Sequence, residues 1–142
     1  MERITPENIT ELQEREIFVF GSNMLGVHGA GAALLAYNNQ WTKYGKWFGA
    51  EFKPKGKLKG SFAIPTKGLH IETLPLDYIN YFVKHFIEYA MKFPNLTFLV
   101  TEIGCGLAGY KVEQIAPMFR EALELENVYL PKRFIEHLNK TK

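Results

Sequence analysis

The sequence has one cysteine, Cys105, and no long hydrophobic run. A single thiol cannot form an internal disulfide or anchor a zinc site alone, which agrees with a reducing compartment. No apolar run approaches the roughly 20 residues of a membrane span, and the segment MERITPENITEL lacks the apolar stretch of a secretory signal. We therefore expect a soluble, cytoplasmic protein that does not act at a membrane.

Internal repeats, low-complexity tracts and linkers rich in serine or proline are also absent. With 142 residues, of which 46% are hydrophobic, the chain is long enough for one core and too short for two ordinary domains. The four histidines show no spacing typical of metal ligands. The sequence predicts one domain over residues 1–142, with no metal and no cofactor.

Short runs rich in branched and aromatic residues predict strands at 17–20, 61–65, 97–103 and 127–130. Helical patterns accompany them at 29–39, 75–93, 112–124 and 131–138. The strands are almost continuously apolar, which is typical of a sheet covered on both faces. This alternating order predicts an α/β layer fold, in which ligands bind just beyond the carboxyl ends of the strands.

Glycine-rich turns follow the first and third of these strands, in the segments GSNMLGVHGAGAALLAY and GCGLAGY. Glycine lets backbone N–H groups approach an anion, and the amino end of a following helix adds partial positive charge. Two such turns are able to grip a diphosphate from both sides. The alternative is that the glycines only make tight turns and close helix packing. A dinucleotide-binding fold is excluded, because too few residues follow Gly109 and the expected acid is missing.

A basic segment at 43–67 contains seven lysines and one acid, Glu51, in a chain whose net charge is only +2. Its lysines are interleaved with the aromatic residues Tyr44, Trp47, Phe48 and Phe52. This composition suits phosphate contacts combined with base stacking. We favour the alternative, an exposed loop or edge strand whose lysines keep it soluble and prevent sheet pairing.

The motifs FVFGSN, HGAGAA, AIPTKG, IGCGLAGY and IAPMF, in this order, resemble a family of uncharacterised small proteins of bacteria and their phages. The pattern spans 17–119 and is similar, more distantly, to the macrodomain superfamily, which binds ADP-ribose. Within that superfamily it is most similar to the terminal ADP-ribose glycohydrolase branch. The resemblance implies a three-layer α/β/α fold with a mixed central sheet. The implied partner is ADP-ribose or an ADP-ribosylated macromolecule.

The resemblance also implies a ligand-binding cleft between the two glycine-rich turns. The first turn and the strand before it contribute Gly21, Ser22, Asn23, His28, Gly29, Ala30 and Gly31. The second turn wraps the diphosphate and distal ribose with Gly104, Cys105, Gly106, Leu107, Ala108, Gly109 and Tyr110. Asn23 matches an asparagine that contacts the distal ribose in many macrodomains. Asn8 lies near the position of an aspartate that binds the adenine amine.

Lys67 and Asn23 are the candidate catalytic residues. Lys67 matches the lysine that attacks the ribose anomeric carbon in the glycohydrolase branch, where it forms a covalent adduct. The carboxylates that assist hydrolysis in related proteins are missing, because Ala33 and Ala108 stand near their positions.

Substitutes for these carboxylates must come within hydrogen-bond reach of the proton that is moved, and the candidates are Glu102, His28 and Glu51. Cys105, activated by His28, is an alternative nucleophile, although a small thiol in a tight glycine turn also serves packing alone. The sequence thus predicts binding of ADP-ribose or a related nucleotide diphosphate and leaves hydrolysis open. The rival hypotheses are a phage-related nucleic-acid-binding accessory protein that uses 43–67, and a scaffold with a degenerate pocket.

Overall fold

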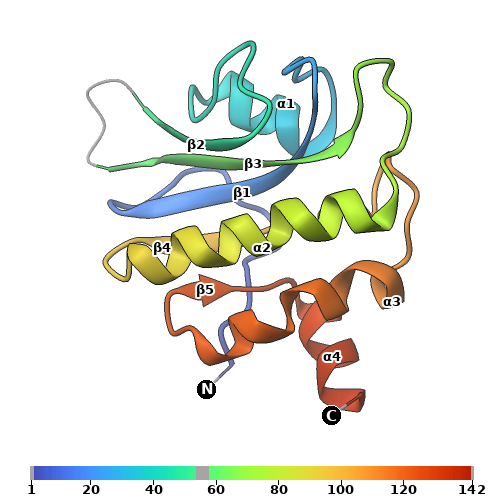
Figure 1. Ribbon diagram of the computed structural model, residues 1–142. Helices are drawn as coiled ribbons and strands as arrows, with labels where there is room; N and C mark the ends of the chain where they lie inside the picture. The colour runs from blue at the N-terminus through green and yellow to red at the C-terminus, as the bar shows by residue number, and fades with distance from the viewer. Residues whose placement is uncertain (1, 54–57, 142) are drawn as a thin grey trace.

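The computed structural model describes residues 2–53 and 58–141. Over these residues, five strands form one sheet in the order β2-β3-β1-β4-β5 (Figure 1). The strands are β1 (Glu16–Asn23), β2 (Gly49–Phe52), β3 (Gly60–Lys67), β4 (Thr97–Val100) and β5 (Val128–Tyr129). β1 runs parallel to β3 and β4, and β4 runs parallel to β5, whereas β2 is antiparallel to β3. The central sheet is therefore mixed, as predicted.

Helices cover both faces of the sheet (Figure 1). They are α1 (Gly31–Asn38), α2 (Leu76–Lys92), α3 (Val112–Ile115), the 3-10 helix η1 (Ala116–Glu124) and α4 (Lys132–Lys140). α1 packs on one face together with Ile9 and Leu12 of the amino-terminal segment. α2, η1 and α4 pack on the other face. The prediction of a three-layer α/β/α fold is confirmed.

Strand β1 explains why the sequence pattern is continuously apolar. Successive side chains of a strand point to opposite faces of the sheet. Ile17 and Val19 enter the core beneath α2, whereas Phe18 and Phe20 enter the core beneath α1. All four side chains are buried, so no polar alternation remains in the sequence.

The structure corrects several predicted boundaries. The edge strand β2 was not predicted among the four strands, and it ends at Phe52, before the lysines on which the edge-strand interpretation of the basic segment depends. Lys55 and Lys57 of that segment lie outside the described residues. The predicted helix 112–124 is a single α-helical turn followed by η1, since Pro117 lacks the N–H group that a continuous α-helix requires. The predicted strand 97–103 leaves the sheet after Val100.

Among the helices of residues 2–53 and 58–141, none combines the length and apolar character of a membrane span. The carboxyl ends of β1, β3 and β4 lie at one edge of the sheet, because the three strands are parallel neighbours. The connections that follow these three strands therefore meet at that edge (Figure 1).

Candidate functional site

Three loops form the candidate site, and each follows one of the parallel strands. We call residues 24–30, after β1, the first glycine loop, and residues 101–111, after β4, the second glycine loop. Residues 68–75, after β3, form a third loop that we call the strap. A Cβ atom placed on Gly21 would lie 3.8 Å from the backbone nitrogen of Gly104, so the end of β1 lies against the second glycine loop.

Hydrogen bonds tie the strap to the second glycine loop. The Thr73 hydroxyl donates to the carbonyl of Ala108 at 3.1 Å, and the Tyr110 hydroxyl donates to the carbonyl of Leu74 at 2.6 Å. On the other side, the N–H of Met24 donates to the carbonyl of Lys67 at 2.9 Å. The three loops are thus one connected unit rather than independent surface turns.

Side chains at the end of β1 shape the first glycine loop. The Asn23 amide donates to the carbonyl of Val27 at 2.8 Å and accepts from its N–H at 3.1 Å. The buried Ser22 hydroxyl donates to the carbonyl of Trp47 at 2.5 Å. Two predicted site residues therefore use side-chain hydrogen bonds to hold the protein's own backbone.

The segment 43–48 packs directly against the first glycine loop. The N–H of Gly45 donates to the carbonyl of Gly26 at 2.9 Å, and the two backbones approach so closely that Gly26 has no room for a side chain. Residues 43–48 of the basic segment therefore form one wall of the candidate site. No local feature of the sequence indicated this contact.

His28, predicted to contact ligand, is a buried part of this wall. Its Nε2 lies 2.9 Å from the carbonyl oxygen of Lys43, which can only accept, so Nε2 carries the proton. The ring packs edge-on against Phe20, and its Nδ1 has no partner among the described residues. Burial lowers the pKa of His28, because the charged form loses hydration there. The geometry favours a structural role for a neutral imidazole.

Acidification is expected to destabilise the protein through His28. Because the folded-state pKa of His28 lies below the unfolded value of about 6.5, the unfolded chain binds this proton first as the pH falls. The contribution to stability is present above the unfolded pKa and is lost as the pH falls through the folded pKa. Urea unfolding at several pH values measures the free energy of unfolding. As the pH falls, this free energy should decrease less in His28→Gln than in the wild type. Equal declines would contradict this role of His28.

The second glycine loop holds one glycine that packing requires. A Cβ atom on Gly104, whose φ is +77°, would lie 3.0 Å from the side chain of Ile115. Cys105 is half-buried beside the core, and burial raises the pKa of its thiol to about 11. The thiol is therefore protonated at neutral pH, which argues against Cys105 as a nucleophile. Leu107 is 73% exposed at the tip of the loop.

Gly29 and Gly106 are glycines that the protein's own structure does not require. Neither has a positive φ, and no atom lies within 4 Å of an added Cβ on either residue. Tight turns and close helix packing therefore do not explain them. Both are exposed, one in each glycine loop.

Unpaired backbone donors accompany these two glycines. The N–H groups of Gly29, Ala30 and Gly31 have no acceptor within 2–53 and 58–141. The same holds for those of Gly106, Leu107 and Ala108. Gly31 also begins α1, whose amino end carries neither a capping side chain nor an acid in its first turn. Each glycine loop thus offers a run of N–H groups suited to anionic oxygen atoms.

The two candidate catalytic residues are neighbours at the sheet edge. Asn23 and Lys67 face each other in the parallel register of β1 and β3. Lys67 is partly buried and also pairs with Thr73 of the strap. A single constellation therefore contains Lys67, Asn23 and both glycine loops.

The carboxylates considered as catalytic partners are occupied or distant. Glu102 accepts two hydrogen bonds from Arg133 at 2.6 and 2.7 Å, which lower the pKa of its carboxyl group and keep it ionised. Glu51 lies opposite Ser61, near the far end of β3 and about 20 Å along the strand from Lys67. Glu72 of the strap, which sequence inspection missed, accepts from the N–H of His70 at 2.9 Å.

Asn8 lies apart from this constellation in the contacts that the structure describes. It is exposed, and the next residue, Ile9, packs in the core beneath α1. No hydrogen bond joins Asn8 to either glycine loop within the described ranges. Within residues 2–53 and 58–141, no group of three or more His, Cys, Asp or Glu side chains is placed to hold a metal ion.

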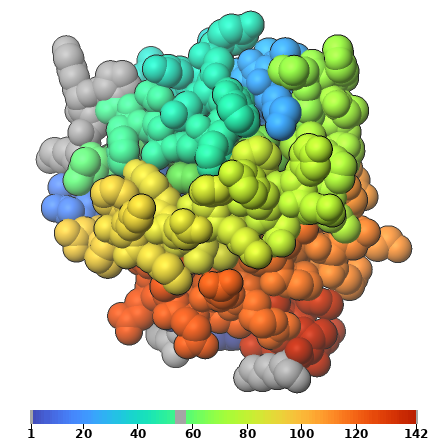
Figure 2. All heavy atoms as spheres, viewed as in Figure 1, coloured from blue at the N-terminus to red at the C-terminus, as the bar shows by residue number. Residues whose placement is uncertain are grey.

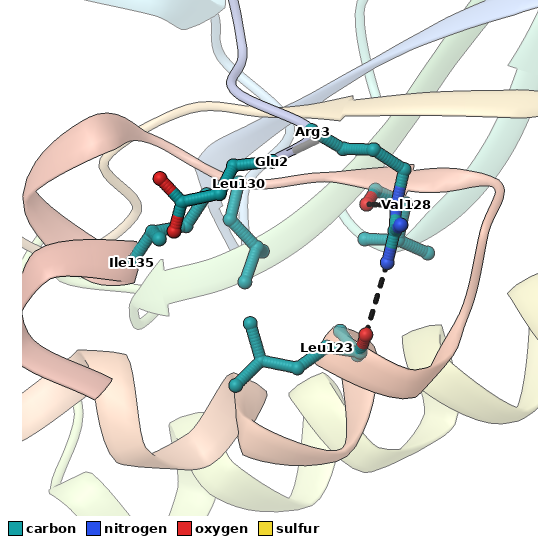
Figure 3. Close-up of a pocket in the computed structure, with 7 residues that line it drawn as sticks. Glu2, Arg3, Leu123, Val128, Leu130 and Ile135 are labelled. Carbon is teal, nitrogen blue, oxygen red and sulfur yellow. Dashed lines mark hydrogen bonds between the residues drawn. The ribbon is translucent and has the colours of Figure 1, made fainter. Parts of the chain in front are cut away.

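Two cavities are lined by residues outside the first glycine loop and the strap. One, of about 250 Å³, is enclosed by the amino-terminal segment, η1, β5 and α4 (Figure 3). Arg3 crosses it and donates to the carbonyls of Leu123 at 2.9 Å and Val128 at 3.4 Å, so its guanidinium is already engaged. The other, of about 520 Å³, lies between the second glycine loop and α4. Gly29 and Gly106 are both exposed, so the two glycine loops lie at the surface of the protein.

No protein-family model and no curated protein matches the chain. Among solved structures, the chain is similar to one entitled "Structure of a Protein of Unknown Function from Bacteroides thetaiotaomicron". The two share 18% sequence identity and a TM-score of 0.63, and the match covers 85% of this chain and 89% of the other. This similarity supports the α/β fold alone, so the macrodomain resemblance stays a hypothesis.

Proposed function

We propose that this protein binds ADP-ribose, or a related nucleotide diphosphate, at the edge where the two glycine loops meet. The observation that carries the proposal is the pair Gly29 and Gly106. Each is a glycine without a packing or conformational reason, and each lies in a run of N–H groups that lack a protein acceptor among the described residues. A ligand whose phosphates approach the backbone closely explains both properties together.

A diphosphate fits the arrangement better than a single phosphate does. The loops follow adjacent parallel strands, so each offers its N–H groups at the same edge of the sheet. The amino end of α1 adds partial positive charge next to Gly31. One phosphate on each glycine loop would use both runs of donors.

Exposed aliphatic side chains surround this edge and suit the sugar and base of a nucleotide. They come from all three loops and are Leu25, Val27, Leu69, Ile71 and Leu107. Ligand sites commonly combine such apolar contacts with a few polar groups that fix orientation. Titration calorimetry with ADP-ribose tests the proposal, and a one-to-one complex is the expected result.

Binding without efficient hydrolysis is the form of this function that we favour. Lys67 lies at the edge, but hydrolysis also needs an acid or base within reach of the moving proton. Glu102 is held ionised by Arg133, and Glu51 lies at the other end of β3. The pKa of Glu72 in the strap is lowered by its own N–H group and by that of His70. Without such a group, a lysine can help hold an anion without breaking the glycosidic bond.

Release of ADP-ribose from an ADP-ribosylated protein is expected to be equally slow with wild type, with Lys67→Ala and with buffer. The physical reason is that Glu102 and Glu72 have lowered pKa values and Glu51 is distant, so none of the three is ready to donate a proton. Release can be followed by mass spectrometry of the free ADP-ribose. A release catalysed by the wild type and lost in Lys67→Ala would instead establish Lys67 as a nucleophile.

A further inference from the structure

An exposed aromatic surface lies beside the first glycine loop, on the outer side of α2. Figure 2 shows the teal segment between α1 and β2 directly above the yellow-green atoms of α2. The surface, which we call the aromatic face, consists of Trp47, Tyr78, Tyr81 and His85. On α2, residues 78, 81 and 85 recur at the spacing of one helix face.

A buried aromatic layer supports these rings. Trp47 packs edge-on against Phe82 with the ring centres 6.1 Å apart, and Tyr81 packs against His85 at 4.6 Å. Phe48 lies between the two elements, 5.0 Å from Phe82 and 6.2 Å from His85. Trp47, Tyr81 and His85 are therefore held in place before any partner arrives, which lowers the entropy cost of binding.

The exposed apolar side chains of this face are all aromatic. In 43–52 and α2 up to Ala90, the large hydrophobic residues that are exposed are Tyr44, Trp47, Phe52, Tyr78 and Tyr81. Trp47 is 40% exposed and Tyr81 is 60% exposed, although both contact neighbouring rings. Aliphatic residues, by contrast, are exposed in the three loops of the candidate site. Nucleobases stack on aromatic rings of this kind without regard to sequence.

Lysines lie close in the sequence to the rings of the aromatic face. Lys43 and Lys46 belong to the same segment as Trp47, and Lys84 lies between Tyr81 and His85 on α2. Lys43 lies 3.7 Å from Glu51, whereas Lys46 and Lys84 make no ion pair with the described residues. Lysine is depleted in protein interfaces but makes typical phosphate contacts in nucleic-acid complexes. Two acids share α2 with these residues: Asp77 lies in the first turn, and Glu88 lies one helical turn beyond Lys84 and His85.

We propose that the aromatic face binds single-stranded nucleic acid. Bases stack on Trp47 and Tyr81, and the phosphates lie near Lys43, Lys46 and Lys84. The aromatic face does not include the N–H groups proposed to bind the diphosphate. The two proposals can therefore be tested independently of each other.

Fluorescence anisotropy with a labelled oligothymidylate of about 15 nucleotides tests this proposal at low salt. Tyr81→Ala and Tyr78→Ala are each expected to weaken binding about tenfold. Both side chains are more than half exposed, so the variants should fold normally. Tyr37→Ala is the matched control, because Tyr37 is 47% exposed on α1, across the sheet. It should bind as the wild type does.

Tryptophan fluorescence supplies a second readout. Trp41 is buried and Trp47 is exposed, so quenching by oligothymidylate reports stacking on Trp47. The logarithm of the affinity should fall with the logarithm of salt concentration, and Lys46→Ala should make this slope shallower by about 0.7. Calorimetry with ADP-ribose should give the wild-type affinity for Tyr81→Ala.

Three results would overturn the proposal. One is the absence of oligothymidylate binding at low salt. Another is an equal loss of affinity in Tyr37→Ala and Tyr81→Ala. The third is a wild-type dimer that Tyr81→Ala converts to a monomer, which would make the aromatic face a protein interface instead.

Discussion

A Gly106→Glu variant is expected to fold like the wild type and to bind ADP-ribose at least a hundredfold more weakly. No atom lies within 4 Å of an added Cβ on Gly106, and its φ is not in the left-handed region, so the side chain is tolerated. The carboxylate would occupy the space in front of the N–H groups of 106–108 and would repel a diphosphate. A hundredfold loss corresponds to about 2.7 kcal/mol, and titration calorimetry measures it directly.

Two further variants separate charge from position. Gly106→Ala adds one methyl group in open space, and a smaller loss is expected from it. Gly29→Glu places the same charge on the first glycine loop and should weaken binding as much as Gly106→Glu does, because both loops hold one ligand. Thermal unfolding of each variant checks that the fold is retained. If both glutamate variants bind ADP-ribose with the affinity of the wild type, the glycine loops are not part of the binding site.

Replacing Gly26 with alanine is expected to lower the free energy of unfolding by about 3 to 5 kcal/mol. Gly26 has a φ of +69°, which an alanine adopts only with strain, and its Cβ would overlap the backbone of Gly45. The variant must therefore separate the first glycine loop from 43–48. Urea unfolding measures the loss.

Gly45→Ala is the matched control for this prediction. Gly45 has a φ of +89° but no atom within 4 Å of an added Cβ, so alanine there introduces strain without a clash. A loss of about 1 to 2 kcal/mol is expected. An equal loss in Gly26→Ala and Gly45→Ala would show that the close approach of the two backbones contributes little.

The layers of the fold were predictable from the sequence, because buried strands and amphipathic helices leave local patterns. β1 and β3 are buried on both faces, and α2 presents a regular apolar stripe. β2 left no such pattern. Its four residues are half-buried or exposed at the sheet edge, and lysines flank it in the sequence.

The glycine loops were also predictable, because clustered glycines are a local feature of the sequence. The contacts that organise the site were not predictable, because they join distant residues. Gly29 and Gly106 are visible in the sequence itself. By contrast, the hydrogen bonds from the Thr73 hydroxyl to the carbonyl of Ala108, and from the Ser22 hydroxyl to the carbonyl of Trp47, join residues far apart in the sequence. His28 looked like a ligand contact because of its neighbours in the sequence. Its burial depends on Phe20 and Lys43, which approach it only in the folded chain.

The aromatic face shows the same limit from another direction. The helical pattern of α2 marks its buried residues, and Tyr78 and Tyr81 fall outside that stripe as ordinary exposed positions. Their proximity to Trp47 arises because 43–48 packs both on the first glycine loop and on Phe82. Sequence inspection assigned the lysines and aromatics of 43–67 to one segment, while the surface draws on two separate elements.

The central claim is that both glycine loops hold one diphosphate through their backbone N–H groups. The most direct measurement is a titration of ¹⁵N-labelled protein with ADP-ribose, followed through the amide resonances. We predict that the resonances of 29–31 and 106–108 shift together and give a single dissociation constant. Shifts confined to one loop, or found only elsewhere in the protein, would contradict the claim.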